Sequence, residues 1–210
     1  MIRILVADDH PIVRQGLKQI IADSPDMVVA GEASNGQEVL EQVWKNEYDV
    51  VLLDLSMPVI SGLDTLKQLK SQKPELIILV LSIHPEEQYA VRVLTAGASG
   101  YVTKDSAAEE LIAAIRAVSS GKKYVSSSLA QKLASKLGGA AVKPLYEILS
   151  DREYSVLRLI AAGRTKIGIA EELSLSPKTV STYRSRILNK LGLKTDAELV
   201  RHAIENRLLG

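Results

Sequence analysis

The sequence contains no cysteine, and this absence excludes a disulfide framework and a thiolate metal site. It has no apolar stretch near the ~20 residues that a membrane-spanning helix needs, and no basic segment followed by an apolar one opens it. We therefore expect a cytoplasmic protein with no membrane partner. With 46% hydrophobic and 24% charged residues, its 210 residues are enough for two globular domains.

The net charge of +1 conceals an uneven distribution along the chain. Residues 1–120 contain 10 lysines and arginines and 17 aspartates and glutamates, a net charge of −7. Residues 121–210 contain 16 lysines and arginines and 8 aspartates and glutamates, a net charge of +8. An acidic half joined to a basic half indicates two separate roles, with nucleic acid as a candidate partner for the second.

Short apolar runs alternate with helical patterns through residues 1–120. This alternation predicts a doubly wound α/β domain with a five-stranded parallel sheet. The runs lie at 2–7, 28–30, 50–53, 77–81 and 100–103. Helices are expected from Pro11, with Ile12, Val13, Leu17, Ile20 and Ile21 at helical spacing, then over 36–45, after Ser61-Gly62, over about 85–97, and over about 106–121.

Four of the apolar runs end in residues that suit a phosphate or cation site. Asp8 and Asp9 follow the first run, and the others end at Asp54, Ser82 and Lys104. Ligands bind beyond the carboxyl ends of parallel strands, so these groups are expected to converge in one crevice. Three carboxylates repel one another unless a cation lies among them, and oxygen ligands without Cys or His favour Mg²⁺.

The same crevice is suited to phosphoryl chemistry. A carboxylate can attack phosphorus to form an aspartyl phosphate, and a lysine can neutralise the phosphoryl oxygens. Asp8 and Asp9 are the pair suited to holding the metal, which leaves the central Asp54 as the attacked group. Tyr101 lies on the last strand, and its ring is large enough to move between a buried and an exposed rotamer.

Residues 121–148 are expected to be a linker with one helix, capped by a serine among residues 126–128 and ended at Gly138-Gly139. Residues 149–210 are predicted to form a four-helix, all-α domain. Its helices are expected from a capping box at Ser150–Glu153 to about 162, over about 166–173, from Ser176-Pro177 to about 191, and from a second box at Thr195–Glu198 to about 207.

The second and third of these helices form a helix-turn-helix pattern, in which the second helix enters the DNA major groove. From residue 174 to 195 there are five basic residues and no acidic one, as expected for a surface that faces an anion. The candidate base contacts are Ser181, Thr182 and Ser185. The candidate phosphate contacts are Lys178, Thr179 and Arg184, and Arg186 and Lys190 complete the predicted DNA surface.

Residues 1–120 resemble the receiver domain of two-component response regulators. The matching residues are Asp8-Asp9, Asp54 with Met57-Pro58 and Gly62 behind it, Ser82, Tyr101 and Lys104. The resemblance implies a flavodoxin-like strand order 2-1-3-4-5 and phosphorylation of Asp54 by a sensor histidine kinase. It also implies Mg²⁺ ligation by Asp8, Asp9, Asp54 and the Ser56 carbonyl, a switch pair of Ser82 and Tyr101, and phosphate contact by Lys104.

Residues 149–210 resemble the LuxR-type DNA-binding domain, so the whole chain resembles the NarL/FixJ family. One departure is Lys166-Ile167-Gly168-Ile169, where the family usually has Asn-Lys-Glu-Ile; glycine within a helix costs about 1 kcal/mol relative to alanine. In the family, part of the final helix forms a two-fold dimer contact suited to inverted-repeat DNA sites. The candidate dimer residues are Leu199, Val200 and Ala203, and the same stripe must also pack on its own domain.

We therefore expect a phosphorylation-dependent transcription regulator that is not an enzyme and is a homodimer when phosphorylated. A phosphoryl charge of about −1.5 to −2 would draw Lys104 and Ser82 inward and let Tyr101 follow. The change would either uncover the recognition helix or promote dimerisation. The alternatives are a phosphorylation-independent binding module and, least favoured, an aspartyl-phosphate hydrolase; haloacid dehalogenase-like hydrolases have a second Asp two residues after the nucleophile, where this chain has Ser56.

Overall fold

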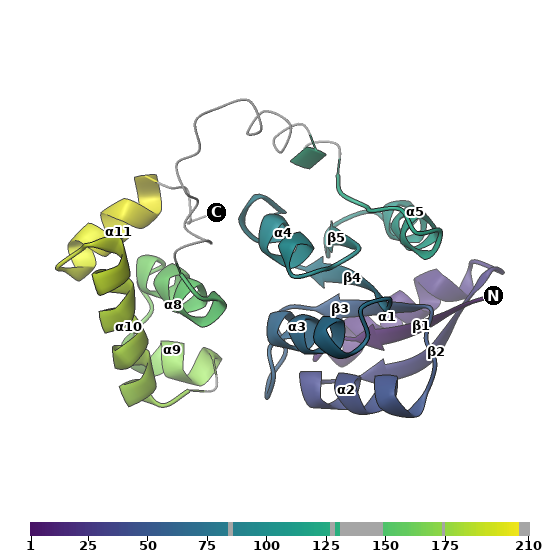
Figure 1. Cartoon of the computed structure of the whole chain (residues 1–210), viewed down its shortest axis with the longest axis horizontal. Coiled ribbons are helices and arrows are strands. Elements are labelled where there is room, and N and C mark those ends of the chain that lie inside the picture. The colour runs from purple at the N-terminus through teal and green to yellow at the C-terminus, as the bar shows by residue number, and fades with distance from the viewer. Residues whose placement is uncertain (84–85, 127–128, 131–148, 174, 206–210) are drawn as a thin grey trace. The chain divides into compact units, whose positions relative to one another are not determined.

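The computed structural model describes residues 1–83, 86–126, 129–130, 149–173 and 175–205 (Figure 1). It divides the chain into two compact units, Met1–Leu137 and Gly138–Gly210. No helix among the described residues is long and apolar enough to cross a membrane. The predicted linker helix begins where Ser126 caps the amide of Leu129 at 3.2 Å, and its remainder lies outside the described residues.

The first unit is built on a five-stranded parallel sheet with the order β2-β1-β3-β4-β5. This confirms the predicted doubly wound architecture and strand order. The strands are β1 (Ile2–Ala7), β2 (Met27–Ala33), β3 (Val50–Asp54), β4 (Ile77–Ser82) and β5 (Gly100–Thr103). The three central strands are almost entirely buried, as expected for a sheet with helices on both faces.

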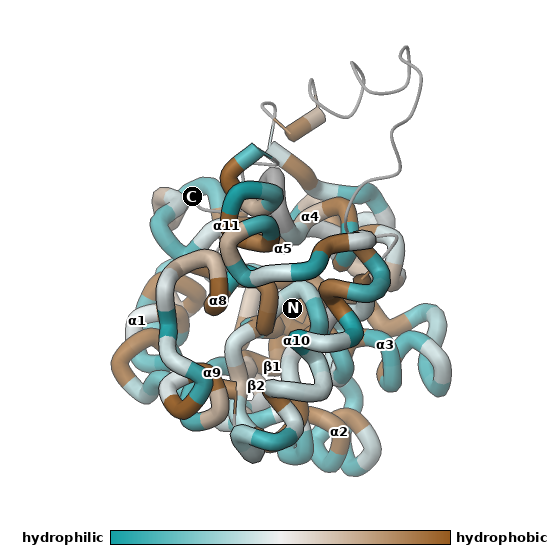
Figure 2. Tube along the Cα trace, turned by 90° about the vertical axis from the view of Figure 1, so that its left-hand side faces the viewer, coloured by the Kyte–Doolittle hydropathy of each residue, from teal (hydrophilic) through white to brown (hydrophobic). Residues whose placement is uncertain are grey.

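Four helices connect the five strands and a fifth follows β5, and local capping sets where several of them begin. Asn35 accepts a hydrogen bond from the Glu38 amide and Ser61 one from the Asp64 amide, which satisfies amides that a helix start leaves open. The helices are α1 (Pro11–Ala22), α2 (Gly36–Lys45), α3 (Gly62–Gln72), α4 (Glu86–Thr95) and α5 (Ala108–Ser119). Figure 2 shows hydrophobic and hydrophilic residues interspersed along the helices, as expected where one side of a helix is buried.

One core lies between the sheet and the helices α1 and α5. Leu17 and Ile21 of α1 pack there with α5 residues such as Ile115 and with alternate strand residues such as Ile4 and Leu52. Ile12 lies in α1 as predicted but is 87% exposed. It lies on the outer side of the first turn, whereas Val13 next to it packs against the core.

The chain adds one further pairing to the sheet after α5. It reverses at Gly121, whose φ is 83°, and Tyr124 then bridges to the edge strand β5 in parallel at Gly100. The Tyr101 amide donates to the Tyr124 carbonyl at 3.2 Å, and the Tyr124 amide donates to the Ser99 carbonyl at 3.0 Å. The predicted domain boundary at residue 120 therefore lies before the last segment that pairs with this sheet.

The second unit contains the four predicted helices. They are α8 (Asp151–Ala161), α9 (Lys166–Glu172), α10 (Pro177–Leu191) and α11 (Asp196–Glu205). The capping box of Ser150 and Glu153 is formed at the start of α8. Helix α9 forms despite Gly168, because this residue lies in the first turn and its amide donates to the Thr165 hydroxyl at 3.1 Å.

Candidate phosphoacceptor site and nucleic-acid interface

The carboxyl ends of β1, β3, β4 and β5 are aligned by the registers of the sheet. This alignment brings Asp8, Asp54, Ser82 and Lys104 to one edge, with Asp9 beside them. Asp8 and Asp54 are each 1% exposed and Ser82 is fully buried. Two nearly buried carboxylates at the end of a sheet are costly unless charged groups compensate them.

Lys104 provides the first compensation. Its Nζ lies 2.6 Å from Asp8 Oδ2 and 2.9 Å from Asp54 Oδ2, and its backbone amide donates to the Ser82 carbonyl at 2.9 Å. Burial lowers the pKa of Lys104, but the two carboxylates outweigh burial and hold its pKa above the ordinary value. The ammonium is therefore a fixed positive charge between the two aspartates.

Asp54 remains the less compensated carboxylate. Its pKa is raised above the ordinary value: burial is the largest cause, Lys104 acts in the lowering direction, and the negative charge of Asp8 raises the pKa again. The Ser56 amide acts in the opposite direction, which places the main chain of Ser56 beside this carboxylate. Both oxygens of Asp54 are buried, and neither accepts a well-oriented hydrogen bond from the described residues, so Oδ1 keeps lone pairs for an electrophile or cation that enters the crevice.

A divalent cation fits this set of donors. Ligand atoms of Asp8, Asp9, His10 and Asp54 all lie within 4.8 Å of one another. Lys104 is close to the Oδ2 atoms of two of these aspartates, so it does not occupy Asp54 Oδ1. A buried carboxylate oxygen without a partner is expected where a cation binds.

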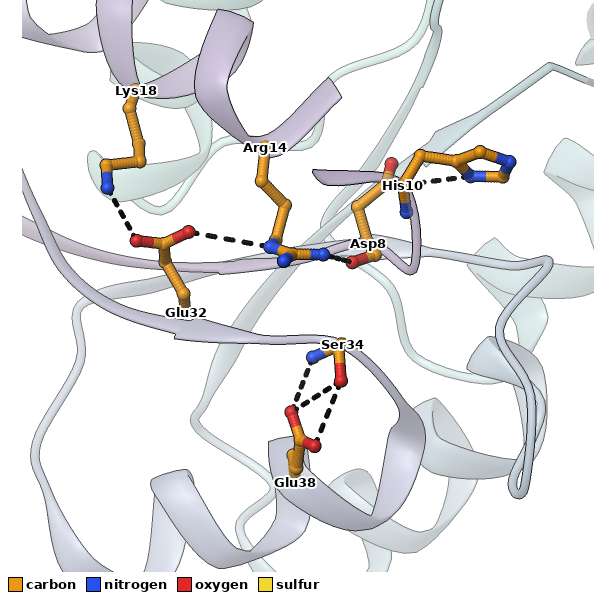
Figure 3. Close-up of polar contacts among 7 residues, drawn as sticks. All are labelled: Asp8, His10, Arg14, Lys18, Glu32, Ser34 and Glu38. Atoms are coloured by element: carbon orange, nitrogen blue, oxygen red, sulfur yellow. Dashed lines mark hydrogen bonds and ion pairs between the residues drawn. The ribbon is translucent and has the colours of Figure 1, made fainter. Parts of the chain in front are cut away.

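The loop that carries Asp8 is fixed by a chain of polar contacts (Figure 3). Arg14 Nη1 donates to the Asp8 carbonyl at 2.7 Å, and its Nε lies 3.4 Å from Glu32 Oε2. Lys18 pairs with the same Glu32 at 2.6 Å, and the His10 amide donates to Asp8 Oδ1 at 2.8 Å. Sequence reasoning missed His10 and Arg14, although His10 directly follows the two aspartates and Arg14 lies one helical turn later.

The loop after Asp54 is tightly packed against the strand that carries this residue. A Cβ on Gly62 would overlap the Asp54 carbonyl oxygen and would lie 2.7 Å from Leu55 Cα. Within the same loop, Val59 has a φ of 68°, a conformation that β-branched residues rarely adopt. The close contact at Gly62 therefore holds the loop against the strand that carries Asp54, and the backbone of the loop is strained at Val59.

The predicted switch pair is in a single, inward arrangement. The side chains of Ser82 and Tyr101 have no exposed surface. The backbone amide of Tyr101 donates to the Tyr124 carbonyl. The ring of Tyr101 therefore occupies the buried one of the two rotamers expected from the sequence.

Helix α10 presents most of the predicted DNA-contacting residues at the surface. Lys178, Thr182, Ser185 and Arg186 are exposed, and Thr179 and Ser181 are half-buried. The three candidate base-reading hydroxyls each donate to a backbone carbonyl one turn earlier, at 3.1 Å in each case. In this arrangement they offer lone pairs rather than protons to a base edge.

Two of the predicted DNA-contacting cations are paired within their own domain. Arg184 Nε lies 2.6 Å from Asp196 Oδ1 at the start of α11, and Lys190 Nζ lies 2.7 Å from Glu153 Oε2. Glu153 is only 3% exposed, so Lys190 compensates a buried carboxylate. The sequence could not reveal these pairs, because their partners are 12 and 37 residues away.

The predicted dimer face of α11 needs correction. Leu199 and Ala203 have no exposed surface, because α11 packs them against α8 in the same unit. Neither side chain can contact a partner while the domain is folded in this way. Val200 is half-buried, and Ile204 is 59% exposed, so the outer side of α11 is the part open to a second chain.

Comparison with known proteins identifies both units. Residues 4–116 match the family described as response regulator receiver domain. Residues 147–203 match bacterial regulatory proteins of the luxR family. The chain belongs to the NarL/FixJ family of response regulators.

The similar proteins match this response regulator over nearly its whole length. The response regulator UvrY of Escherichia coli K12 is 38% identical over 209 residues, which cover 99% of this chain and 96% of UvrY. The response regulator GacA of Pseudomonas viridiflava is 38% identical over 210 residues, which cover 100% of this chain and 98% of GacA. A similar solved structure is that of RcsB from Salmonella enterica serovar Typhimurium, bound to promoter rprA in the presence of phosphomimetic BeF3⁻. It has a TM-score of 0.66 and 29% identity, and the match covers 96% of this chain and 98% of the RcsB chain.

These matches confirm the predicted class of function. This response regulator is a DNA-binding transcription regulator of a two-component system and not an enzyme. They also exclude the hydrolase alternative, because the relatives named above are all response regulators. The acidic cluster of Asp8, Asp9 and Asp54 is compatible with Mg²⁺.

Proposed function

We propose that a sensor histidine kinase phosphorylates this regulator on Asp54 with Mg²⁺, and that phosphorylation increases its affinity for DNA. The single observation that carries the proposal is the state of Asp54. Its carboxylate is 1% exposed, lies 2.9 Å from Lys104 Nζ, and keeps an oxygen without a hydrogen-bond partner among the described residues. A buried carboxylate beside a fixed cation is suited to attack phosphorus and to hold the product.

In this transfer the bond between phosphorus and the donor nitrogen breaks, and a bond between phosphorus and an Asp54 oxygen forms. Lys104, held in its charged form, would neutralise the phosphoryl oxygens. When bound, Mg²⁺ would supply positive charge to the same oxygens. Asp8, Asp9, Asp54 and the Ser56 carbonyl would hold it.

The switch would act through the groups already at this edge. The new charge, about −1.5 to −2, competes with Asp8 for Lys104, and the buried Ser82 hydroxyl would turn towards it. Tyr101 is buried one strand away and would follow Ser82. This couples the phosphoryl group to the strand β5 and to the Tyr124 segment paired with it.

The rim of the crevice supports a protein as the phosphodonor. Ile12, Val59 and Ile83 are 87%, 71% and 70% exposed, and they lie in the segments that follow β1, β3 and β4. Exposed apolar residues gathered near one site are typical of a protein-binding surface. We therefore propose that the kinase contacts these residues.

Double-stranded DNA is the proposed output partner, in paired half-sites bound by a homodimer. The RcsB structure described above contains a promoter, and a second similar RcsB structure contains two RcsB dimers bound to two parallel DNAs. The exposed cationic and hydroxyl side chains of α10 support the same mode here. In that mode Lys178 and Thr179 bind phosphates, and Ser181, Thr182, Ser185 and Arg186 lie toward the major groove.

The test is to treat the full chain with Mg²⁺ and a small acyl-phosphate donor. Its mass in solution and its affinity for inverted-repeat DNA are then measured before and after treatment. We expect both to rise for the wild type and to stay constant for Asp54→Ala. Asp23→Ala is the matched control, because Asp23 is exposed at the far end of α1, and this variant should respond like the wild type. Equal responses of Asp54→Ala and wild type would overturn the proposal.

A further inference from the structure

The site contains a nitrogen donor beside its three carboxylates. His10 directly follows Asp8 and Asp9, and its Nδ1 lies 2.7 Å from Asp9 Oδ1 and 3.4 Å from Asp8 Oδ1. The ring is 65% exposed, so a cation bound at Nδ1 would displace little protein from around it. This side chain has no part in the phosphoryl transfer described above.

The contact between His10 and Asp9 is not an ordinary hydrogen bond. Asp9 Oδ1 is buried and accepts no hydrogen bond from the described residues, although the imidazole nitrogen is only 2.7 Å away. The N–H direction of the ring therefore does not point at this oxygen. The contact therefore places an imidazole nitrogen and a carboxylate oxygen side by side at the edge of the acidic cluster.

The spacing of these atoms fits a six-coordinate divalent cation. With bonds of about 2.1 Å, neighbouring ligands are about 3.0 Å apart and opposite ligands about 4.2 Å apart. The distances of 2.7 and 3.4 Å from His10 Nδ1 are close to the neighbouring value. The whole set spans up to 4.8 Å, so closure on an ion needs a movement of about half an ångström relative to that ideal.

We propose that His10 is a ligand of the divalent cation and makes this site prefer a first-row transition-metal ion, such as Mn²⁺, over Mg²⁺. The inference deepens the proposed function, since it rests on a cation binding among the same carboxylates. Mg²⁺ favours oxygen ligands and water, whereas imidazole is a good ligand of transition-metal ions. One imidazole among carboxylates therefore increases affinity for Mn²⁺ and leaves affinity for Mg²⁺ nearly unchanged.

The test is calorimetric titration of the full chain with MgCl₂ and with MnCl₂. His10→Ala and His10→Asn remove the ring but keep the backbone amide that donates to Asp8 Oδ1. We expect each variant to lose about tenfold in affinity for Mn²⁺ and less than about twofold for Mg²⁺. His202→Asn makes the same change in the other unit and should alter neither affinity.

Pulsed electron paramagnetic resonance of bound Mn²⁺ gives an independent readout. It should show the coupling of a directly coordinated imidazole nitrogen in the wild type and lose it in His10→Ala. Equal losses for both ions would show that His10 acts only by orienting Asp9, and would overturn the inference, as would unchanged affinities in both variants. If the wild type bound neither cation, the metal part of the proposed function would fail as well.

Discussion

Val59 is the position where the structure predicts that a substitution should stabilise the protein. Its φ of 68° places an L-residue in the left-handed region, which costs about 1–2 kcal/mol. The side chain is 71% exposed, so truncating its apolar part loses only about 0.5 kcal/mol of the 1.5–3 kcal/mol that full burial gives. Asparagine adopts this conformation more readily than other non-glycine residues.

We therefore expect Val59→Asn to increase the free energy of unfolding of the first unit by about 1 kcal/mol, which corresponds to a rise in Tm of about 4 °C. Trp44 is the only tryptophan in the chain. It is 60% exposed on α2, with Lys73 Nζ 5.3 Å from its ring centre. Its fluorescence during urea unfolding therefore reports on the unit that contains Val59.

Two further variants separate backbone strain from side-chain effects. Ile83→Asn replaces another exposed apolar residue, 70% exposed, at a position without a positive φ, and should give no gain. Val59→Ala keeps a Cβ in the strained conformation and should give a smaller gain than asparagine. An unchanged or lower stability of Val59→Asn, or an equal gain in Ile83→Asn, would refute the strain argument.

Three other predictions follow from single contacts. Gly100→Ala places a Cβ 2.7 Å from the Tyr124 carbonyl oxygen, so hydrogen exchange at the Tyr124 amide should accelerate while β4 stays protected; unchanged exchange would contradict this. Glu153→Ala removes a capping group and the partner of Lys190 and should lower the stability of the second unit by about 2 kcal/mol in calorimetry of the full chain. Burial raises the pKa of Glu153, but Lys190 and the capping bonds outweigh it and hold its pKa below 4.5. The difference in stability between the wild type and Glu153→Ala should therefore be complete above pH 4.5, and the part that depends on ionised Glu153 should disappear as pH falls through the folded pKa. Burial raises the pKa of Asp54 above its ordinary value, so folding disfavours the ionised form. The stability gain of Asp54→Asn in urea titrations should therefore grow as pH rises from the ordinary aspartate pKa to the folded pKa and stay constant above it; a gain that shrinks over this range would contradict the argument.

The sequence predicted the fold where local patterns decide it. Helix α2 has the predicted bounds of 36–45, and the two predicted capping boxes mark the starts of α8 and α11. The strand ends predicted the meeting of Asp8, Asp54 and Lys104, because a parallel sheet aligns its carboxyl ends.

The features that the sequence did not predict depend on contacts between distant residues. Nothing local marks Lys190 as the partner of Glu153, or Tyr124 as a residue that pairs with β5. The same holds for the stripe of α11, where spacing identified Leu199 and Ala203 as apolar but could not tell a domain core from a dimer surface. Burial in the folded unit decides that question.

The central claim is that Asp54 accepts the phosphoryl group, and peptide mass mapping tests it most directly. The full chain is treated with an acyl-phosphate donor and a divalent cation and then digested, with and without hydroxylamine, which cleaves acyl phosphates. We predict one hydroxylamine-labile phosphoryl group, located on Asp54 and absent from Asp54→Asn. A phosphoryl group on Asp8 or Asp9, or equal labelling of Asp54→Asn, would contradict the account.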